Sequence, residues 1–196
     1  MKKLIKTLKN IWSIEELRSK ILFTLIMIVI YRVGSHIVLP GIDPTAIPQS
    51  SENEGILGLI DAFSGGAFSN ASIFALGIMP YISASIFMQL MTVLVPQFQK
   101  MQKEGESGRK KINQYTRYLT VGVTILQASA YVTYLRDMFK QGGMMAGFTP
   151  ANFWLTTVVI LTAGTLFVMW MGEKITDKGL GNGTSLIIMI GIVARL

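Results

Sequence analysis

The sequence predicts an all-α protein, a polytopic bundle of helices that crosses a membrane several times. Three observations predict this class. Apolar residues make up 51% of the chain and charged residues only 15%, whereas a soluble domain carries about 25% charged residues. The apolar residues are gathered in runs long enough to cross the roughly 30 Å core of a bilayer as helices. The basic residues are concentrated in alternate connections between these runs.

The N-terminal segment, residues 1–20, is predicted to precede the first span in the cytoplasm. Leu4, Ile5 and Leu8 share one face of a helix over Met1–Asn10, and lysines cover the other face. This pattern fits an amphipathic helix on an anionic membrane surface or, alternatively, a solvated tail. Charged residues interrupt the apolar positions, so no cleavable signal peptide is predicted.

The first predicted span covers residues 21–39. A helix of this length rises about 28 Å, close to the thickness of the hydrocarbon core. Arg32 and His36 lie four residues apart and therefore on one helical face. Because charge is costly within a bilayer, we expect both side chains to contact protein or the interface, as anchors rather than as a proton relay.

A short apolar segment, ILGLIDAFSGGAFS over residues 56–69, follows a polar loop. Its apolar stretch is too short to span a bilayer, and Gly65 and Gly66 interrupt it, so we predict a re-entrant or interfacial segment. Irregular backbone persists at membrane depth only where protein or a water-filled cavity surrounds it. The segment therefore indicates a pore.

Four further apolar runs follow, over residues 71–95, 118–135, 153–171 and 186–196. The first of them contains Gly77 and Pro80, and the proline is expected to bend the helix. The last run is too short to cross a bilayer before the sequence stops. We therefore expect the chain to be part of a longer protein, cut within its fifth span.

Basic residues are distributed unevenly between the connections. One side holds six before the first span, six after the second and two after the fourth, namely Lys2, Lys3, Lys6, Lys9, Arg18, Lys20, Lys100, Lys103, Arg109, Lys110, Lys111, Arg117, Lys174 and Lys178. The other side holds Arg136 and Lys140. Because cytoplasmic loops are enriched in such residues, the N-terminus is predicted to be cytoplasmic. The net charge of +7 then meets anionic lipids, and direct nucleic-acid binding is not predicted.

Enzymatic and metal chemistry find little support in the sequence. Cysteine is absent and His36 is the single histidine, so we predict no metal site and no cofactor. An intramembrane serine protease would need a base beside SGGAFS, and nothing orients His36 for that role. A secondary transporter of a small solute remains the alternative, because such proteins also contain broken helices and re-entrant segments.

Four long stretches resemble the bacterial SecY family of protein-conducting channels. They are YRVGSHIVLPGID (Tyr31–Asp43), FSGGAFSNASIFALGIMPYISASIFMQL (Phe63–Leu90), KEGESGRKKINQYTRY (Lys103–Tyr118) and GEKITDKGLGNGTSLII (Gly172–Ile188). Since that family has ten spans in two halves, the resemblance implies the N-terminal five-span half of such a channel. It further implies a multi-pass protein of the bacterial inner membrane that passes unfolded polypeptides across the membrane and hydrophobic segments sideways into it.

The resemblance also implies functional residues. Ile78, Ile82 and Ile188 would contribute to a pore ring, although composition alone makes them ordinary span residues. Residues 59–68 would form a plug, or alternatively an inert hairpin, with Phe63 near the ring and Asp61 facing water; its assigned residues are Leu59, Ile60, Asp61, Phe63, Ser64, Gly65, Gly66 and Phe68. Gln89 and Gln127 would lie at a lateral gate, or simply join helices.

Implied partners are the SecE and SecG subunits, the SecA motor, the ribosome, signal peptides and nascent chains, and membrane lipids. In this family the main docking loops for the motor and the ribosome belong to the second half, beyond this sequence. The basic stretch KEGESGRKK (residues 103–111) is expected to form a flexible cytoplasmic turn.

Overall fold

The computed structural model describes residues 13–46, 56–139 and 149–194, which leaves the predicted amphipathic helix over residues 1–10 outside the described part of the chain. Its elements are α2 (Glu15–Gly34), the short 3₁₀ helix η1 (Pro44–Ala46), α3 (Ile56–Ser64), α4 (Met79–Leu94), α5 (Pro96–Lys103), α6 (Glu106–Met138), α7 (Pro150–Lys178) and α8 (Gly183–Val193).

Capping residues explain where the later helices begin. Thr149 accepts a hydrogen bond from the Asn152 N–H and precedes Pro150 at the start of α7. Asn182 accepts from the Ser185 N–H at the start of α8. These side chains satisfy backbone donors that the first turn of a helix leaves free, and proline needs no partner there.

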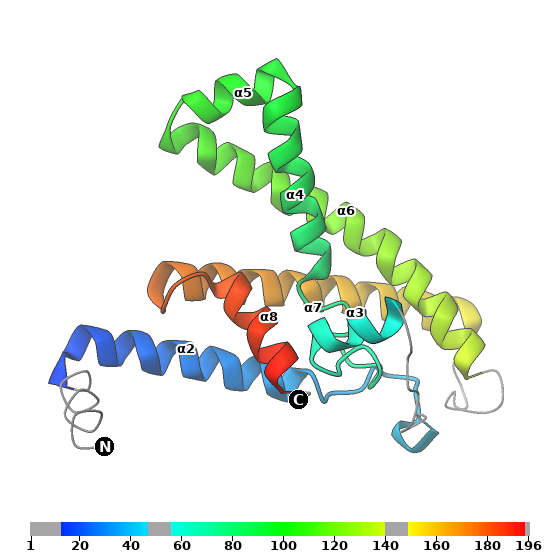
Figure 1. Ribbon diagram of the computed structural model, residues 1–196. Helices are drawn as coiled ribbons and strands as arrows, with labels where there is room; N and C mark the ends of the chain where they lie inside the picture. Colours follow the sequence, from blue (N-terminus) through cyan, green and yellow to red (C-terminus); the bar gives the residue numbers. More distant parts are fainter. Residues whose placement is uncertain (1–12, 47–55, 140–148, 195–196) are drawn as a thin grey trace.

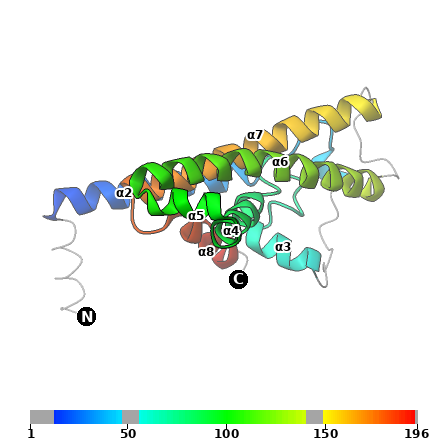
Figure 2. The ribbon, with the colours of Figure 1, turned by 90° about the horizontal axis from the view of Figure 1, so that it is seen from above.

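Helix α7 lies at the centre of the bundle and contacts α2, α4, α6 and α8. In both views α2 and α7 lie side by side, and the short α3 lies near α8 (Figures 1 and 2). Arg117 of α6 joins Glu173 of α7 through two hydrogen bonds, of 3.0 and 2.7 Å. Helices α4, α5 and the first half of α6 form a triangular projection from this bundle (Figure 1).

The helix boundaries differ from the predicted spans in informative ways. Helix α2 begins before residue 21 and ends at Gly34, so His36 follows the helix. Pro80 lies in the first turn of α4 and starts this helix instead of bending it, since proline lacks the N–H that the helix interior requires. The irregular backbone before α4 includes Gly77 with a φ of 52°.

The basic stretch over residues 103–111 is largely helical, so the prediction of a flexible turn is wrong for most of it. Helix α6 begins at Glu106 and continues to Met138 without a break. Only a short turn at Gly105, with a φ of 76°, separates α5 from α6. The two helices pack against each other, which converts the stretch into a helical hairpin.

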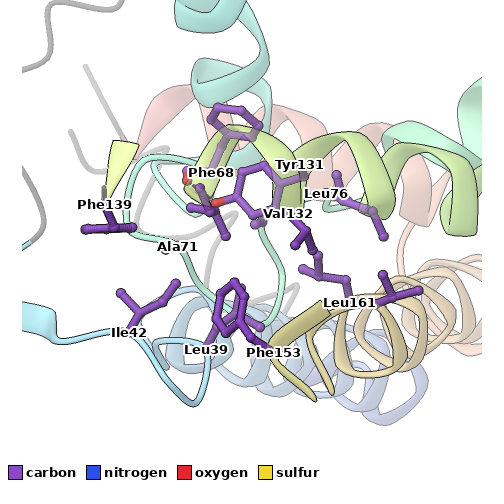
Figure 3. Packing of buried hydrophobic residues seen from close by; sticks show 14 residues of the cluster. Leu39, Ile42, Phe68, Ala71, Leu76, Tyr131, Val132, Phe139, Phe153 and Leu161 are labelled. Carbon is purple, nitrogen blue, oxygen red and sulfur yellow. Dashed lines mark hydrogen bonds between the residues drawn. The ribbon is translucent and has the colours of Figure 1, made fainter. Parts of the chain in front are cut away.

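Buried apolar residues form two clusters. The first, called the bundle cluster here, lies between α6, α7 and the segments that flank α3; Figure 3 shows Phe68 beside Tyr131, with Leu39 and Phe153 nearby. An isolated antiparallel bridge between Val38 and Ser72 joins the segment after α2 to the segment before α4. The second cluster contains the predicted ring residues.

By length and composition, α7 is the one described helix that could cross a membrane alone. Helices α4 and α5 meet the same criterion as a pair bent by 98° at Pro96. Helix α2 contains Arg18, Lys20 and Arg32, and α6 contains many threonine and tyrosine residues. With these polar residues, α2 and α6 do not meet the criterion.

Candidate functional site

The three predicted ring isoleucines belong to one apolar cluster, which we call the ring cluster. Its buried members are Tyr31, Phe74, Ile78, Val168, Met171, Ile175 and Ile187, and residues packed against them include Met27, Ile73, Tyr81, Ile82 and Ile188. The cluster therefore joins α2, α4, α7 and α8.

Ile78 and Ile82 occupy successive positions on one side of α4. Ile78 is the residue immediately before the helix, and its carbonyl accepts the Ile82 N–H at 3.1 Å. Ile78 is only 3% exposed and faces α7 and α8, whereas Ile82 and Ile188 are half-buried. Of the three predicted ring residues, Ile82 and Ile188 thus keep some exposed surface, whereas Ile78 does not.

The predicted plug segment, residues 59–68, consists of the end of α3 and a turn. Gly65 and Gly66 have φ values of 65° and 85°, a left-handed conformation that glycine adopts without strain. The Gly66 N–H donates to the Asp61 carbonyl at 3.0 Å, and the Ser64 hydroxyl accepts from the Phe68 N–H at 3.1 Å. The turn is therefore compact and held by its own hydrogen bonds.

Asp61 is fully buried, so the prediction that it faces water is wrong. Its Oδ1 accepts the Ser69 N–H at 2.8 Å, across the turn that the two glycines create. A buried carboxylate requires such donors. Asp61 therefore organises the plug segment from inside.

Three side chains from neighbouring helices donate to backbone carbonyls of the plug segment. Tyr31 Oη lies 3.3 Å from the Ser64 oxygen, and Arg32 Nη1 lies 3.3 Å from the Gly65 oxygen. Tyr131 Oη lies 2.7 Å from the Phe68 oxygen. The contact of Arg32 agrees with the expectation that it anchors protein, while His36 is exposed and contacts the Arg32 carbonyl.

Helix α8 supports the plug segment from another side. A β-carbon added to Gly191 would lie 2.8 Å from the Phe63 carbonyl oxygen, so glycine permits this close approach. The side chains of Phe63 and Leu59 are partly exposed, at 37% and 61%. Ile60 and Phe68 pack into the bundle cluster.

The two predicted gate glutamines lie in different cavities between α4 and α6. Gln127 lines an apolar cavity of about 300 Å³ together with Ile60, Phe68 and Tyr131. Gln89 lines a more polar cavity of about 210 Å³ with Arg109 and Asn113. Gln89 lies on α4 and Gln127 lies on α6, and the structure does not bring the two side chains together. Their role at a lateral gate stays a prediction.

Sequence reasoning missed Tyr31 and Tyr131 as plug contacts. Each is an ordinary aromatic residue of a long helix, and its partner is a backbone carbonyl 33 or 63 residues away. Such a pairing leaves no pattern in the sequence. The described residues also contain no group of three or more His, Cys, Asp or Glu side chains that could hold a metal ion.

Comparisons with known proteins agree on one family. The family model for SecY matches residues 72–196. Protein translocase subunit SecY of Streptomyces scabiei is 50% identical over 188 residues, covering 91% of this chain and 43% of that protein. The same subunit of Aquifex aeolicus is 48% identical over 192 residues, covering 96% of this chain and 45% of the relative. The chain spans less than half the length of these relatives.

Solved structures with a similar fold include one described as the structure of a protein conducting channel and another described as Sec61 in the canine ribosome–channel complex from the endoplasmic reticulum. Each aligns with a TM-score of 0.61 and 21% identity, covering 90% of this chain and 36% of the other. At this identity the likeness concerns the fold.

Proposed function

This chain belongs to the SecY family, and on that premise we propose that it forms the N-terminal half of a protein-conducting channel. The channel passes unfolded secretory polypeptides across the bacterial inner membrane and releases membrane segments sideways into lipid. It acts as a passage and not as an enzyme. The proposed partners are SecE, SecG, the SecA motor, the ribosome, and the signal peptides and nascent chains that it conducts.

The observation that carries this proposal is the ring cluster. Ile82 and Ile188 come from different helices and pack against the same buried apolar residues. A constriction of branched apolar side chains excludes water and ions by dewetting, yet it offers no hydrogen bond that would hold a passing chain. A small-solute transporter would need coordinating groups at this point, which favours the channel.

The plug segment completes the proposal. It lies against α8 beside Gly191, on the same helix as Ile188. A short segment with two glycine residues in its turn is suited to block a pore at rest and to move when a polypeptide enters. The seam between α4 and α6, which contains Gln89 and Gln127, is the proposed part of the lateral gate.

Substitution of a ring residue tests the function. We expect Ile82→Ser in the assembled channel to raise ion conductance across a planar bilayer, because a hydroxyl lets water enter the constriction. Ile125→Ser is the matched control, since Ile125 lies on α6, outside the ring cluster, and is 42% exposed. Equal conductance of the two variants would contradict the ring assignment.

A further inference from the structure

We propose that Tyr31, Arg32 and Tyr131 form a carbonyl latch, a set of three donors that holds the plug turn (residues 64–68) against the bundle. The proposal rests on the proposed function, because it concerns how the plug segment is kept in its resting place. The three donors come from two helices, α2 and α6, and all their acceptors fall within this one turn.

The acceptors lie at and just after the end of α3, at Ser64. The carbonyls that follow the end of a helix lack the partners that a continuing helix would supply. Ser64 and Phe68 each receive one backbone N–H, from Ala67 at 3.4 Å and from Ala71 at 3.2 Å, and a tyrosine hydroxyl supplies a second donor to each. The donor to the Gly65 carbonyl is the guanidinium of Arg32.

Burial makes the latch effective. Tyr31 and Tyr131 are 1% and 3% exposed, so little water competes for their hydrogen bonds. Arg32 is half-buried near the end of α2. An ionisable residue within a span is costly unless it has a specific partner, and the plug turn provides that partner.

The latch also connects the plug turn to the α4–α6 seam. Gln127 and Tyr131 lie four residues apart on α6, and both line the apolar cavity of about 300 Å³ with Ile60 and Phe68. Tyr131 therefore contacts the plug turn and the seam together. A displacement of α6 away from α2 would separate Tyr131 from the Phe68 carbonyl while Tyr31 stayed in place, which would loosen the turn from one side first.

Amide hydrogen exchange tests the latch directly. In the assembled channel, Tyr31→Phe and Tyr131→Phe each remove one donor and keep the ring that packs in the core. We expect exchange of the amides over residues 64–70 to become about fivefold faster in each variant, as for the loss of one hydrogen bond. The double variant and Arg32→Met should show a larger increase.

Tyr134→Phe is the matched control. The Tyr134 ring stacks on Phe68 with centroids 5.5 Å apart, but its hydroxyl donates to none of the three acceptor carbonyls. Amide exchange over residues 64–70 in the Tyr134→Phe variant should match that of the unsubstituted channel. Unchanged exchange in both Tyr31→Phe and Tyr131→Phe, or an equal change in Tyr134→Phe, would overturn the latch. Conductance of Ile82→Ser tests the ring separately, so failure of either proposal can be recognised.

Discussion

Asp61 organises the plug turn at the scale of a single residue. Its Oδ1 accepts the N–H of Ser69, eight residues further along, and its own carbonyl accepts the Gly66 N–H and the Ser64 hydroxyl. These bonds close the turn around a fully buried side chain. A buried N–H that loses its acceptor costs about 1–3 kcal/mol, so the side-chain oxygen contributes to stability as well as to shape.

Two substitutions of Asp61 should therefore distinguish the contribution of its side-chain oxygen to stability from the contribution of its charge. We expect Asp61→Ala to lower the free energy of unfolding by about 1–3 kcal/mol more than Asp61→Asn, because asparagine keeps an oxygen that can accept the Ser69 N–H. Thermal unfolding of the purified channel in detergent measures the difference. Equal losses in the two variants would show that this acceptor is unimportant.

At the scale of elements, the α5–α6 hairpin depends on close packing at Gly108. A β-carbon at this position would lie 1.6 Å from the Met101 carbonyl oxygen. The side chain of Phe98 in α5 meets Tyr115 in α6 edge to face, with ring centroids 6.0 Å apart. The hairpin is thus a packed unit, in which α5 follows α4 at a sharp bend and returns the chain to α6.

Alanine at two glycines of α6 should have opposite effects. Gly108→Ala must separate α5 from α6, and we expect it to destabilise the protein by about 1–3 kcal/mol, as for other overpacked sites. Gly122→Ala meets nothing within 4 Å and should be neutral or stabilising by up to about 1 kcal/mol. Protease resistance of the hairpin reports the local effect. A stable Gly108→Ala variant would contradict this packing.

At the scale of the whole molecule, the uneven distribution of basic residues predicts how the bundle is oriented in the membrane. The basic residues of α5 and the start of α6, and those at the end of α7, lie at the ends that the sequence assigns to the cytoplasm. The loop after α2, which contains Thr45, is predicted to lie on the other side. The proposed orientation follows from this asymmetry.

Cysteine labelling can test the orientation because the chain has no cysteine. A membrane-impermeant maleimide added outside spheroplasts should label Thr45→Cys in the assembled channel. It should label Lys111→Cys only after the membrane is permeabilised. Both positions are exposed, so a difference reports the side of the membrane, and the reverse pattern would contradict the proposed topology.

The general architecture could be predicted because the length of an apolar run and the position of a proline act locally. Pro150 begins α7 three residues before the predicted span over residues 153–171, whereas α5, which begins at Pro96, was not predicted. The burial of Asp61 and the contact between Tyr131 and Phe68 could not be predicted, since each requires the folded turn to bring its partner close. Gly77 and Pro80 set the start of α4 at the residue after Ile78, and the Ile78 carbonyl still accepts the Ile82 N–H.

The composition of the ring cluster determines whether the constriction of the proposed pore changes its charge with pH. Its described members are aliphatic, sulfur-containing or aromatic, and the only ones with a dissociable proton are tyrosines. A phenol remains neutral throughout the physiological range. In the proposed channel, these side chains should therefore stay uncharged in acidic and in mildly alkaline surroundings, so that the ring cluster itself adds no pH-dependent charge to the barrier.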